Sequence, residues 1–255
     1  MKIHIVGSRA AELQTYIRTQ EFDFVFDTDE PEVVIAYGGD GTLLSAERLF
    51  PGIPKVMIRA SRVCTECVEK AKKIMLSLLA RRAYQLVEQM KLSAQIHHEK
   101  IVALNDIVVG HVRVNGTLRF RFAVDNAPYE EEVFGDGVVV STPLGSTGYY
   151  QTITRNYFSA GMGIAFNNPI TAMNHLVVSP QSTIVVEITR GQGLVAADND
   201  ERELAVAAGD RITISAAEER ARFVEFAPAY AQYNMLVGRE RIPLGFCQIC
   251  GIVRV

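Results

Sequence analysis

Apolar and polar residues follow two different patterns along the chain, and the change falls near residue 84. Residues 33–37 form a continuous apolar run that ends at glycines, which is typical of a strand buried on both faces of a parallel sheet. Amphipathic runs separate such strands. Strands are predicted over residues 2–7, 22–26, 33–37 and 53–58, and helices over about 9–20, 41–50 and 65–81. The first eighty residues therefore predict an α/β sheet.

The pattern after Tyr84 is that of short strands with alternating polarity. Residues 114–117, Val-Asn-Gly-Thr, predict a tight hairpin turn between two alternating runs. Residues 149–169 mix aromatic residues, Gly and Asn, and are expected to form helix with loop. Further strands are predicted over residues 175–178, 183–189, 203–207, 211–216 and 222–226. The second part of the chain therefore predicts a β-rich, antiparallel domain.

Composition describes an ordinary soluble globular protein, large enough for one large domain or two small ones. The chain has 255 residues, of which 48% are hydrophobic and 22% charged. Its formal net charge is -3 and its Lys and Arg residues are scattered, which argues against nucleic acid or an anionic membrane as partner. The N-terminus does not resemble a signal peptide and no apolar run is long enough for a membrane helix, so a cytoplasmic location is expected.

The first motif with chemical content is Gly38-Gly39-Asp40-Gly41-Thr42, between the predicted strand and a predicted helix. Glycines at such a turn let backbone N–H groups approach phosphate oxygens, and the helix N-terminus favours negative charge. A carboxylate would repel phosphate, so Asp40 makes sense as an acceptor of a proton from an attacking hydroxyl or as a ligand of Mg²⁺. The alternative is a glycine turn that only reverses the chain, with Asp40 as a turn residue.

The second motif is the segment 136–149, in which an apolar strand leads into hydroxyl groups and glycines. Asp136 opens it, and Ser, Thr and freed N–H groups suit the recognition of sugar hydroxyls, phosphates and a base edge. Tyr149 could stack on adenine. The alternative is a helix start capped by Ser or Thr after a strand. The candidate ligand-binding residues of this segment are Asp136, Thr142, Ser146, Thr147 and Tyr149.

A third motif places two polar side chains, Asn105 and Asp106, in the apolar strand over 103–109. An acidic residue beside an Asn can hold the two hydroxyls of a ribose. The alternative is the end of a strand at a turn.

All four cysteines fall in two C-x-x-C pairs, Cys64 with Cys67 and Cys247 with Cys250. Each pair can direct two thiolates to one point, so the two pairs together could complete a tetrahedral structural Zn²⁺ site. The alternatives are a redox pair and plain buried thiols.

The order of the three motifs, GGDGT, then ALND, then GDGVVVSTPLGSTGY, resembles the NAD kinase family over residues 33–149, and more weakly to about residue 225. The resemblance implies an enzyme that transfers a phosphoryl group from ATP or polyphosphate to the adenosine ribose 2′-hydroxyl of NAD, with a divalent metal such as Mg²⁺. Asp40 would be the general base. Gly38, Gly39, Gly41 and Thr42 would hold phosphates.

The resemblance also implies where NAD is held. Asn105 and Asp106 would hold a ribose, Asp136 would lie near the nicotinamide, and Thr147 and Tyr149 would line the adenine pocket. NAD would bind between two domains, an α/β domain over residues 1–86 plus 238–255 and a β-rich domain over 87–237. The returning chain end would make a zinc clip between the cysteine pairs plausible, and a homodimer or homotetramer is expected.

The chain departs from the family pattern at several places that bear on substrate preference. Asp106 stands where the family has Glu, Gly148 replaces Ala and Leu144 replaces a small or polar residue. Residues 58–64 stand where the family has G-x-N-x-G-x-L-G-F-L, and the stretch after Tyr149 also differs. Two other functions therefore stay open: a lipid or small-alcohol kinase of the wider GGDGT group, and an inactive NAD or NADP sensor.

Overall fold

A computed structural model describes residues 1–20, 22–26, 29–60, 65–113, 115–129 and 131–226, apart from the side chains of residues 65–68 and 70. The chain forms two compact units. Unit 1 contains residues 1–89 and the segment that starts at Ala221, and unit 2 contains residues 90–220. No helix among the described residues is long and apolar enough to cross a membrane.

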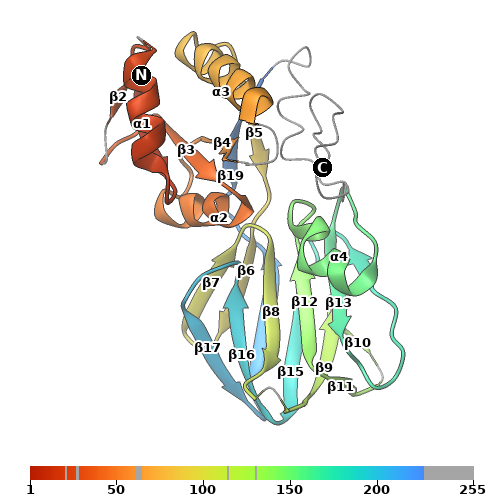
Figure 1. Ribbon diagram of the computed structural model, residues 1–255. Helices are drawn as coiled ribbons and strands as arrows, with labels where there is room; N and C mark the ends of the chain where they lie inside the picture. Colours follow the sequence, from red (N-terminus) through yellow and green to blue (C-terminus); the bar gives the residue numbers. More distant parts are fainter. Residues whose placement is uncertain (21, 27–28, 61–64, 114, 130, 227–255) are drawn as a thin grey trace, which may run out of the picture. The chain divides into compact units, whose positions relative to one another are not determined.

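Unit 1 is built on one six-stranded sheet with the order β2-β1-β3-β4-β19-β5 (Figure 1). All neighbouring strands run parallel except β5, which is antiparallel to β19. The strands are β1 (Lys2–Val6), β2 (Val25–Phe26), β3 (Val33–Gly38), β4 (Lys55–Arg59), β5 (Gln85–Gln89) and β19 (Ala221–Glu225). The α/β prediction for the N-terminal part is confirmed.

Helices cover both faces of this sheet. The helices are α1 (Ala10–Thr19), α2 (Asp40–Leu49) and α3 (Thr65–Ala80). Leu13 and Ile17 of α1 pack with α3 against one set of strand side chains, which includes Ile35. Leu43 of α2 packs against the opposite set, which includes Ala36. Because successive side chains of a strand point to opposite faces, the continuous apolar run of β3 supplies both cores.

A buried ion pair joins α2 to the strand beneath it. Lys55 at the start of β4 is 0% exposed and its Nζ contacts Glu47 Oε2, while the same Nζ donates to the carbonyl oxygen of Phe50. A lysine can be buried in this way only if its charge is matched, so the pair fixes the C-terminal half of α2 against the sheet.

Unit 2 consists of two antiparallel sheets that share one core. The first has the order β10-β9-β15-β18-β6-β7, with β11 also paired to β9, and the second has the order β14-β13-β12-β8-β16-β17. Inner side chains of both sheets, among them Phe120 and Val138, belong to the same apolar cluster. The second sheet carries α4 (Tyr149–Thr154) on its outer face, where Tyr150 packs on Val139 and Ala165. The β-rich, antiparallel prediction for this part is confirmed.

The strands of the first sheet are β6 (Leu92–Ile96), β7 (Glu99–Ala103), β9 (Leu118–Val124), β10 (Ala127–Pro128), β11 (Val133–Gly135), β15 (Ile184–Arg190) and β18 (Arg211–Ala216). Those of the second sheet are β8 (Asp106–His111), β12 (Gly137–Ser141), β13 (Met162–Asn167), β14 (Leu176–Val178), β16 (Gln192–Ala197) and β17 (Glu203–Ala207). A short 3₁₀ helix, η1 (Gly145–Thr147), precedes α4.

Two local predictions differ from the structure. The hairpin predicted around residues 114–117 is wrong, because the strands on either side, β8 and β9, lie in different sheets. The N–H of Gly116 does donate to the carbonyl of Arg113, but the turn carries the chain from one sheet to the other. The strand predicted over 222–226 exists as β19, yet it pairs with β4 and β5 in unit 1, whereas we had expected it in the β-rich domain.

Candidate functional site

The carboxyl ends of β1 and β3 form a topological switch point in unit 1. From β1 the chain passes through α1 to β2 on one side, and from β3 it passes through α2 to β4 on the other side. The two connections cross opposite faces of the sheet. Ligands of open α/β sheets bind in the crevice at such a point, beyond the carboxyl ends of the strands. The GGDGT segment occupies this position.

The glycine loop, residues 38–42, turns the chain from β3 into α2 in very little space. A Cβ on Gly38 would lie 2.2 Å from the Thr42 hydroxyl oxygen. A Cβ on Gly7, after β1, would lie 2.2 Å from the carbonyl oxygen of Tyr37, and its φ of 138° is one that favours glycine. Gly39 is the N-cap of α2 and supplies no side-chain cap. The loop thus presents backbone and a helix N-terminus, which favour an anionic group.

Asp40 is the first residue of α2 and its side chain is 68% exposed. Its Oδ1 accepts a hydrogen bond from Arg59 Nη2 at 2.9 Å. Arg59 ends β4, the strand next to β3, so the two side chains come together at the same edge of the sheet. The structure therefore offers an accessible carboxylate at the glycine loop, with a guanidinium beside it.

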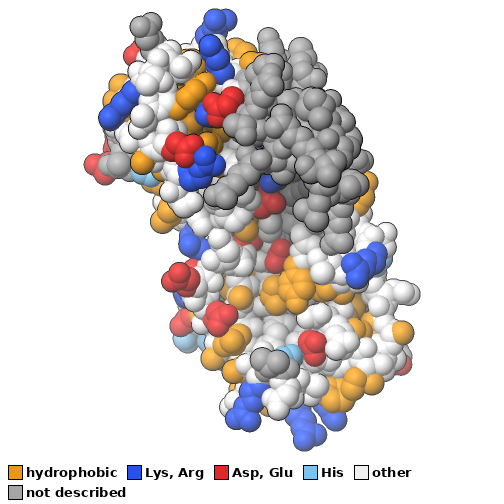
Figure 2. Space-filling view, viewed as in Figure 1, with side chains coloured by type: hydrophobic (Ala, Val, Ile, Leu, Met, Phe, Trp, Pro, Cys, Tyr) orange, Lys and Arg blue, Asp and Glu red, His pale blue; other side chains and the backbone are white. Residues whose placement is uncertain are grey.

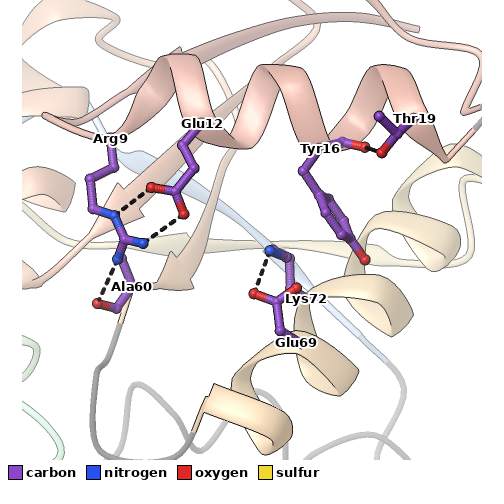
Figure 3. Close-up of polar contacts among 7 residues, drawn as sticks. All are labelled: Arg9, Glu12, Tyr16, Thr19, Ala60, Glu69 and Lys72. Carbon is purple, nitrogen blue, oxygen red and sulfur yellow. Dashed lines mark hydrogen bonds and ion pairs between the residues drawn. The ribbon is translucent and has the colours of Figure 1, made fainter.

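A second guanidinium lies at this edge of the sheet. Arg9, just before α1, donates to both carboxylate oxygens of Glu12 at 2.8 and 2.6 Å and to the carbonyl of Ala60 at 3.5 Å (Figure 3). Its guanidinium also lies 5.7 Å from the ring centre of Tyr37, the residue before the glycine loop. Arg9, which follows β1, therefore contacts the end of β3 and the residue that follows β4.

The face of unit 1 that carries α1 and α3 is tied by a second polar cluster. Lys72 of α3 is 4% exposed, pairs with Glu69 at 2.7 Å and lies 3.8 Å from the ring centre of Tyr16 (Figure 3). A buried ammonium over an aromatic face is stabilised by both contacts. This cluster holds the two helices together and belongs to the scaffold of the site.

In unit 2 the structure brings the second and third motifs into direct contact. We call residues 104–106 the Asn105 turn. The N–H of Thr142 donates to the carbonyl of Asn105 at 2.8 Å, and the Thr142 hydroxyl donates to the carbonyl of Leu104 at 2.8 Å. A Cβ on Gly145 would lie 2.2 Å from the Asn105 carbonyl oxygen, so only glycine fits there. Residues of the two motifs that are 37 or more positions apart in sequence are thus packed against each other.

Thr142 and Ser146 have structural positions. Both are 0% exposed. The Thr142 hydroxyl also accepts from the N–H of Gly145 at 3.0 Å, and the Ser146 hydroxyl lies 2.8 and 3.0 Å from the carbonyls of Pro143 and Phe158. In the structure both hydroxyls shape the segment, and their contact with a ligand stays a prediction. Thr147 is half-buried and remains accessible.

The Asn105 turn also receives a carboxylate from a distant residue. Asp198 accepts the N–H groups of Leu104, Asn105 and Asp106 at 2.6, 2.8 and 3.1 Å. Burial raises the pKa of Asp198, while these three N–H groups and the charge of Lys91 oppose the rise.

The neighbouring Asp106 is 9% exposed. Burial raises its pKa to about 7, and the Asp198 carboxylate adds to this rise. Near neutral pH the Asp106 carboxyl is therefore protonated in a large part of the molecules and can then donate a hydrogen bond. The side chain of Asn105, the residue before Asp106, is half-buried and so remains accessible to a ligand.

Asp136 and the Tyr149 hydroxyl contact neighbouring asparagines at the other end of the strands. Ser141 pairs with Asp106, whereas Gly137 pairs with Gly110, so Asp136, the residue before Gly137, is roughly 17 Å along the sheet from Asp106. Asn168 donates to Asp136 at 3.3 Å, and the adjacent Asn167 donates to the Tyr149 hydroxyl at 2.8 Å. Tyr149 is 39% exposed.

In Figure 2, hydrophobic side chains gather on part of the described surface of unit 2, close to the position of α4 in Figure 1. In the same view, acidic and basic side chains are scattered over the described surface. A small cavity of about 250 Å³ lies elsewhere in this unit, beside His97, His98 and Leu204, and contains none of the predicted site residues.

The predicted zinc ligands cannot be placed. Cys64, Cys247 and Cys250 and the side chain of Cys67 lie outside the described residues. Within the described part of the chain, no group of three or more His, Cys, Asp and Glu side chains could hold a metal ion.

Three residues of this site were missed in the sequence: Arg9, Arg59 and Asp198. The first two follow or end a strand at the carboxyl edge of the sheet, so the α/β pattern could have pointed to them. No local pattern marks Asp198.

Comparison with known proteins agrees with this geometry. The family described as the ATP-NAD kinase C-terminal domain matches residues 104–226. The NAD kinase of Thermoplasma acidophilum is 27% identical over 202 residues, which is 76% of this chain and 74% of that protein. The NAD kinase of Rhodococcus opacus is 31% identical over 221 residues, which is 78% of this chain and 66% of that protein.

Solved structures share the fold at low sequence identity. An NAD kinase from Archaeoglobus fulgidus in complex with ATP has a TM-score of 0.73 at 18% identity, covering 94% of this chain and 100% of that one. Yeast NADH kinase complexed with NADH has a TM-score of 0.75 at 14% identity, covering 96% and 89%. The sequence relatives, the matched domain and the shared fold lead to one conclusion: the chain belongs to the NAD kinase family of enzymes.

Proposed function

We propose that this enzyme transfers the terminal phosphoryl group of ATP, or of polyphosphate, to the 2′-hydroxyl of the adenosine ribose of NAD and so makes NADP. The observation that carries the proposal is the exposed carboxylate of Asp40 on the glycine loop at the switch point of the unit 1 sheet. A loop that served only to bind phosphate would gain nothing from a negative charge, whereas phosphoryl transfer to an alcohol requires an acceptor for the proton of its hydroxyl.

The 2′-oxygen forms a bond to the terminal phosphorus, and the bond from that phosphorus to its bridging oxygen breaks. The diphosphate product leaves with that electron pair, and the Asp40 carboxylate accepts the proton of the 2′-hydroxyl. Gly38, Gly39 and the first turn of α2 hold phosphate oxygens through backbone N–H groups. Catalysis then comes mainly from positioning and electrostatics.

Unit 2 would hold NAD. Asn105, which is half-buried, and Asp106, which is buried, are neighbours in sequence, and both carry groups that can bond to ribose hydroxyls. Asp136, Thr147 and Tyr149 remain candidates for the rest of NAD. Since Asp136 lies at the opposite end of the strands from the Asn105 turn, we propose that Asp136 and Asn105 contact different parts of the ligand.

A divalent metal fits this site as a companion of the donor. Mg²⁺ is usually bound by one or two carboxylates together with substrate phosphates, and Asp40 supplies one carboxylate at the glycine loop. Bound there, it would neutralise charge that develops on the phosphates. A homodimer or homotetramer and a structural zinc held by the four cysteines are further proposals from the sequence.

The zinc proposal has a direct test. Elemental analysis of the purified protein should give close to one zinc per chain, and Cys64→Ser with Cys67→Ser should lose it. A stable protein without zinc would remove the proposal.

The function is tested by measuring NADP with an NADP-specific dehydrogenase after incubation of the protein with NAD, ATP and Mg²⁺. Parallel reactions replace ATP by polyphosphate and NAD by NADH. Asp40→Asn is the inactive variant, and Asp23→Asn, an exposed residue of the same unit before β2, is its matched control. NADP that appears with wild type and Asp23→Asn but not with Asp40→Asn supports the proposal. Binding of NAD without any NADP would instead favour a sensor, and no binding a kinase for another alcohol.

A further inference from the structure

The backbone of Asn105 is held on both sides by groups from other parts of the chain. Its N–H donates to Asp198 Oδ1 at 2.8 Å. Its carbonyl oxygen accepts the N–H of Thr142 at 2.8 Å and lies 3.3 Å from the Ser141 hydroxyl. With both backbone groups fixed, the direction in which the Asn105 side chain leaves the turn is fixed as well.

The Thr142 side of this arrangement lies within a motif of the family pattern, but the Asp198 side does not. Asp198 directly follows β16, whose last residue, Ala197, pairs with Ile107 of β8. The N–H of Asp198 donates to the carbonyl of Asp106 at 3.0 Å, and its φ of 51° is a left-handed conformation that Asp adopts more readily than most residues. The backbone thus turns Asp198 back over the start of β8.

The carboxylate meets three successive N–H groups there. Oδ2 accepts from Leu104 at 2.6 Å, and Oδ1 accepts from both Asn105 and Asp106, at 2.8 and 3.1 Å. Successive N–H groups that converge on one point form an anion-binding nest, and here a side chain of the protein occupies it. Hydrogen bonds to a charged acceptor are the stronger kind, especially in a partly buried place.

We propose that Asp198 is a positioning residue of the nucleotide site, which holds the Asn105 turn in the geometry that lets Asn105 contact the ribose of NAD. The inference rests on the proposed function, because it assigns Asn105 to the acceptor nucleotide. Asp198 does not touch the ligand in this role, and it acts only through the three backbone N–H groups.

The test compares Asp198→Asn with Asp125→Asn. The first variant keeps the shape but replaces one carboxylate oxygen by an NH₂ group, which faces N–H donors. Asp125 is a matched control in the other sheet of unit 2, since its carboxylate also accepts a distant backbone N–H, from Thr183 at 2.8 Å, and a hydroxyl, from Ser182 at 2.7 Å. Both variants lose a negative charge that fixes a turn.

Asp198→Asn should raise the KM for NAD by about 10- to 100-fold, the scale on which a displaced ligand-holding group costs affinity. The KM for ATP should stay within about twofold, and kcat should change far less than the KM for NAD. Asp125→Asn should leave both KM values near those of wild type. A KM for NAD that is unchanged in Asp198→Asn, or that rises equally in Asp125→Asn, would overturn the proposal.

Two further measurements test the proposal if wild type makes no NADP or if Asp198→Asn does not fold. If wild type makes no NADP, titration of NAD into wild type and Asp198→Asn still decides the role of Asp198, because the expected loss is one of binding. If Asp198→Asn does not fold, hydrogen exchange of wild type decides. The amides of Leu104, Asn105 and Asp106 should then exchange slowly, like strand amides, and exchange as fast as in an open loop would refute the proposal.

Discussion

The glycine loop and the Asn105 turn are both short, polar and placed at the ends of strands, but they are held in opposite ways. The glycine loop is defined by neighbours in sequence, because the space beside Gly38 is filled by Thr42, four residues on. The Asn105 turn is defined by Asp198, 93 positions away. A search for local motifs finds all the residues that define the glycine loop. For the Asn105 turn it finds Asn105 and Asp106 but misses Asp198.

The carboxylates of the two regions differ in the same sense. Asp40 is exposed and has a guanidinium beside it, whereas Asp106 is buried and has a second carboxylate nearby. An exposed acid can take up a proton and exchange it with water. A buried acid beside another is suited to a fixed hydrogen bond.

The largest effect expected from this contrast is on the rate of Asp40→Asn. Loss of a general base costs about 10²- to 10⁴-fold in kcat, and the affinity for NAD should persist because NAD is assigned to unit 2. Since Asp40 is exposed, its replacement should change the free energy of unfolding by less than about 0.5 kcal/mol. Steady-state kinetics and urea unfolding measure the two quantities, and an undiminished kcat would remove Asp40 as the base.

The next largest effect concerns the stability of α2 and β4, which support the glycine loop. Glu47→Gln removes one partner of the buried pair with Lys55 and should cost about 3–5 kcal/mol of unfolding free energy, because an uncompensated charge remains buried. Glu12→Gln, which breaks the exposed pair with Arg9, is the control and should cost several times less. Equal losses in urea unfolding would show that burial of Lys55 does not matter.

A third effect tests the buried carboxyl pair through pH. The pKa of Asp106 is about 7 in the folded protein against 3.8 as the ordinary value, so the folded state binds more protons between these pH values. The contribution of this group to the free energy of unfolding is greatest below pH 3.8. As pH rises through 7 this contribution, up to about 4 kcal/mol, is lost. The free energy of unfolding, measured with urea from pH 4 to 8, should therefore fall more steeply for wild type than for Asp106→Asn.

Asp125→Asn gives the opposite control for that experiment. Backbone N–H donation from Thr183, with the Ser182 hydroxyl, lowers the pKa of Asp125, so its contribution is present above the ordinary value and is lost as pH falls. Parallel pH profiles for wild type and Asp106→Asn would contradict the buried pair.

How far the sequence predicts this molecule follows from the range of the interactions involved. The strand at residues 33–38 and the turn into α2 were predictable because an apolar run and glycines are local signals. The β-rich pattern was also readable, but pairing was not: residues 114–117 predicted a hairpin, and the flanking strands joined different sheets. Alternating polarity shows that one face of a strand is buried, and it does not say against which partner.

The candidate site residues also divide into those that local sequence marks and those that distant contacts place. Asp40, Asn105 and Asp106 stood out by residue type and position, and the family resemblance gave them roles. Burial of Thr142 and Ser146 could not be read, since a hydroxyl that binds a ligand and one that binds a carbonyl look alike in sequence. Asp198 depends on contacts that only the fold creates.

The antiparallel pairing of β5 with β19 has a consequence for how the chain is made. Gln89 and Ala221 are partners in that ladder, so the entire second unit leaves and re-enters unit 1 through two adjacent strands, as an insertion does in a hairpin. During synthesis β19 cannot pair with β4 until residues 90–220 have been made. Folding of these residues first is favoured, because it shortens the loop that must close when β19 pairs. For the same reason a two-residue turn such as Asn-Gly could replace the insertion and leave unit 1 free-standing.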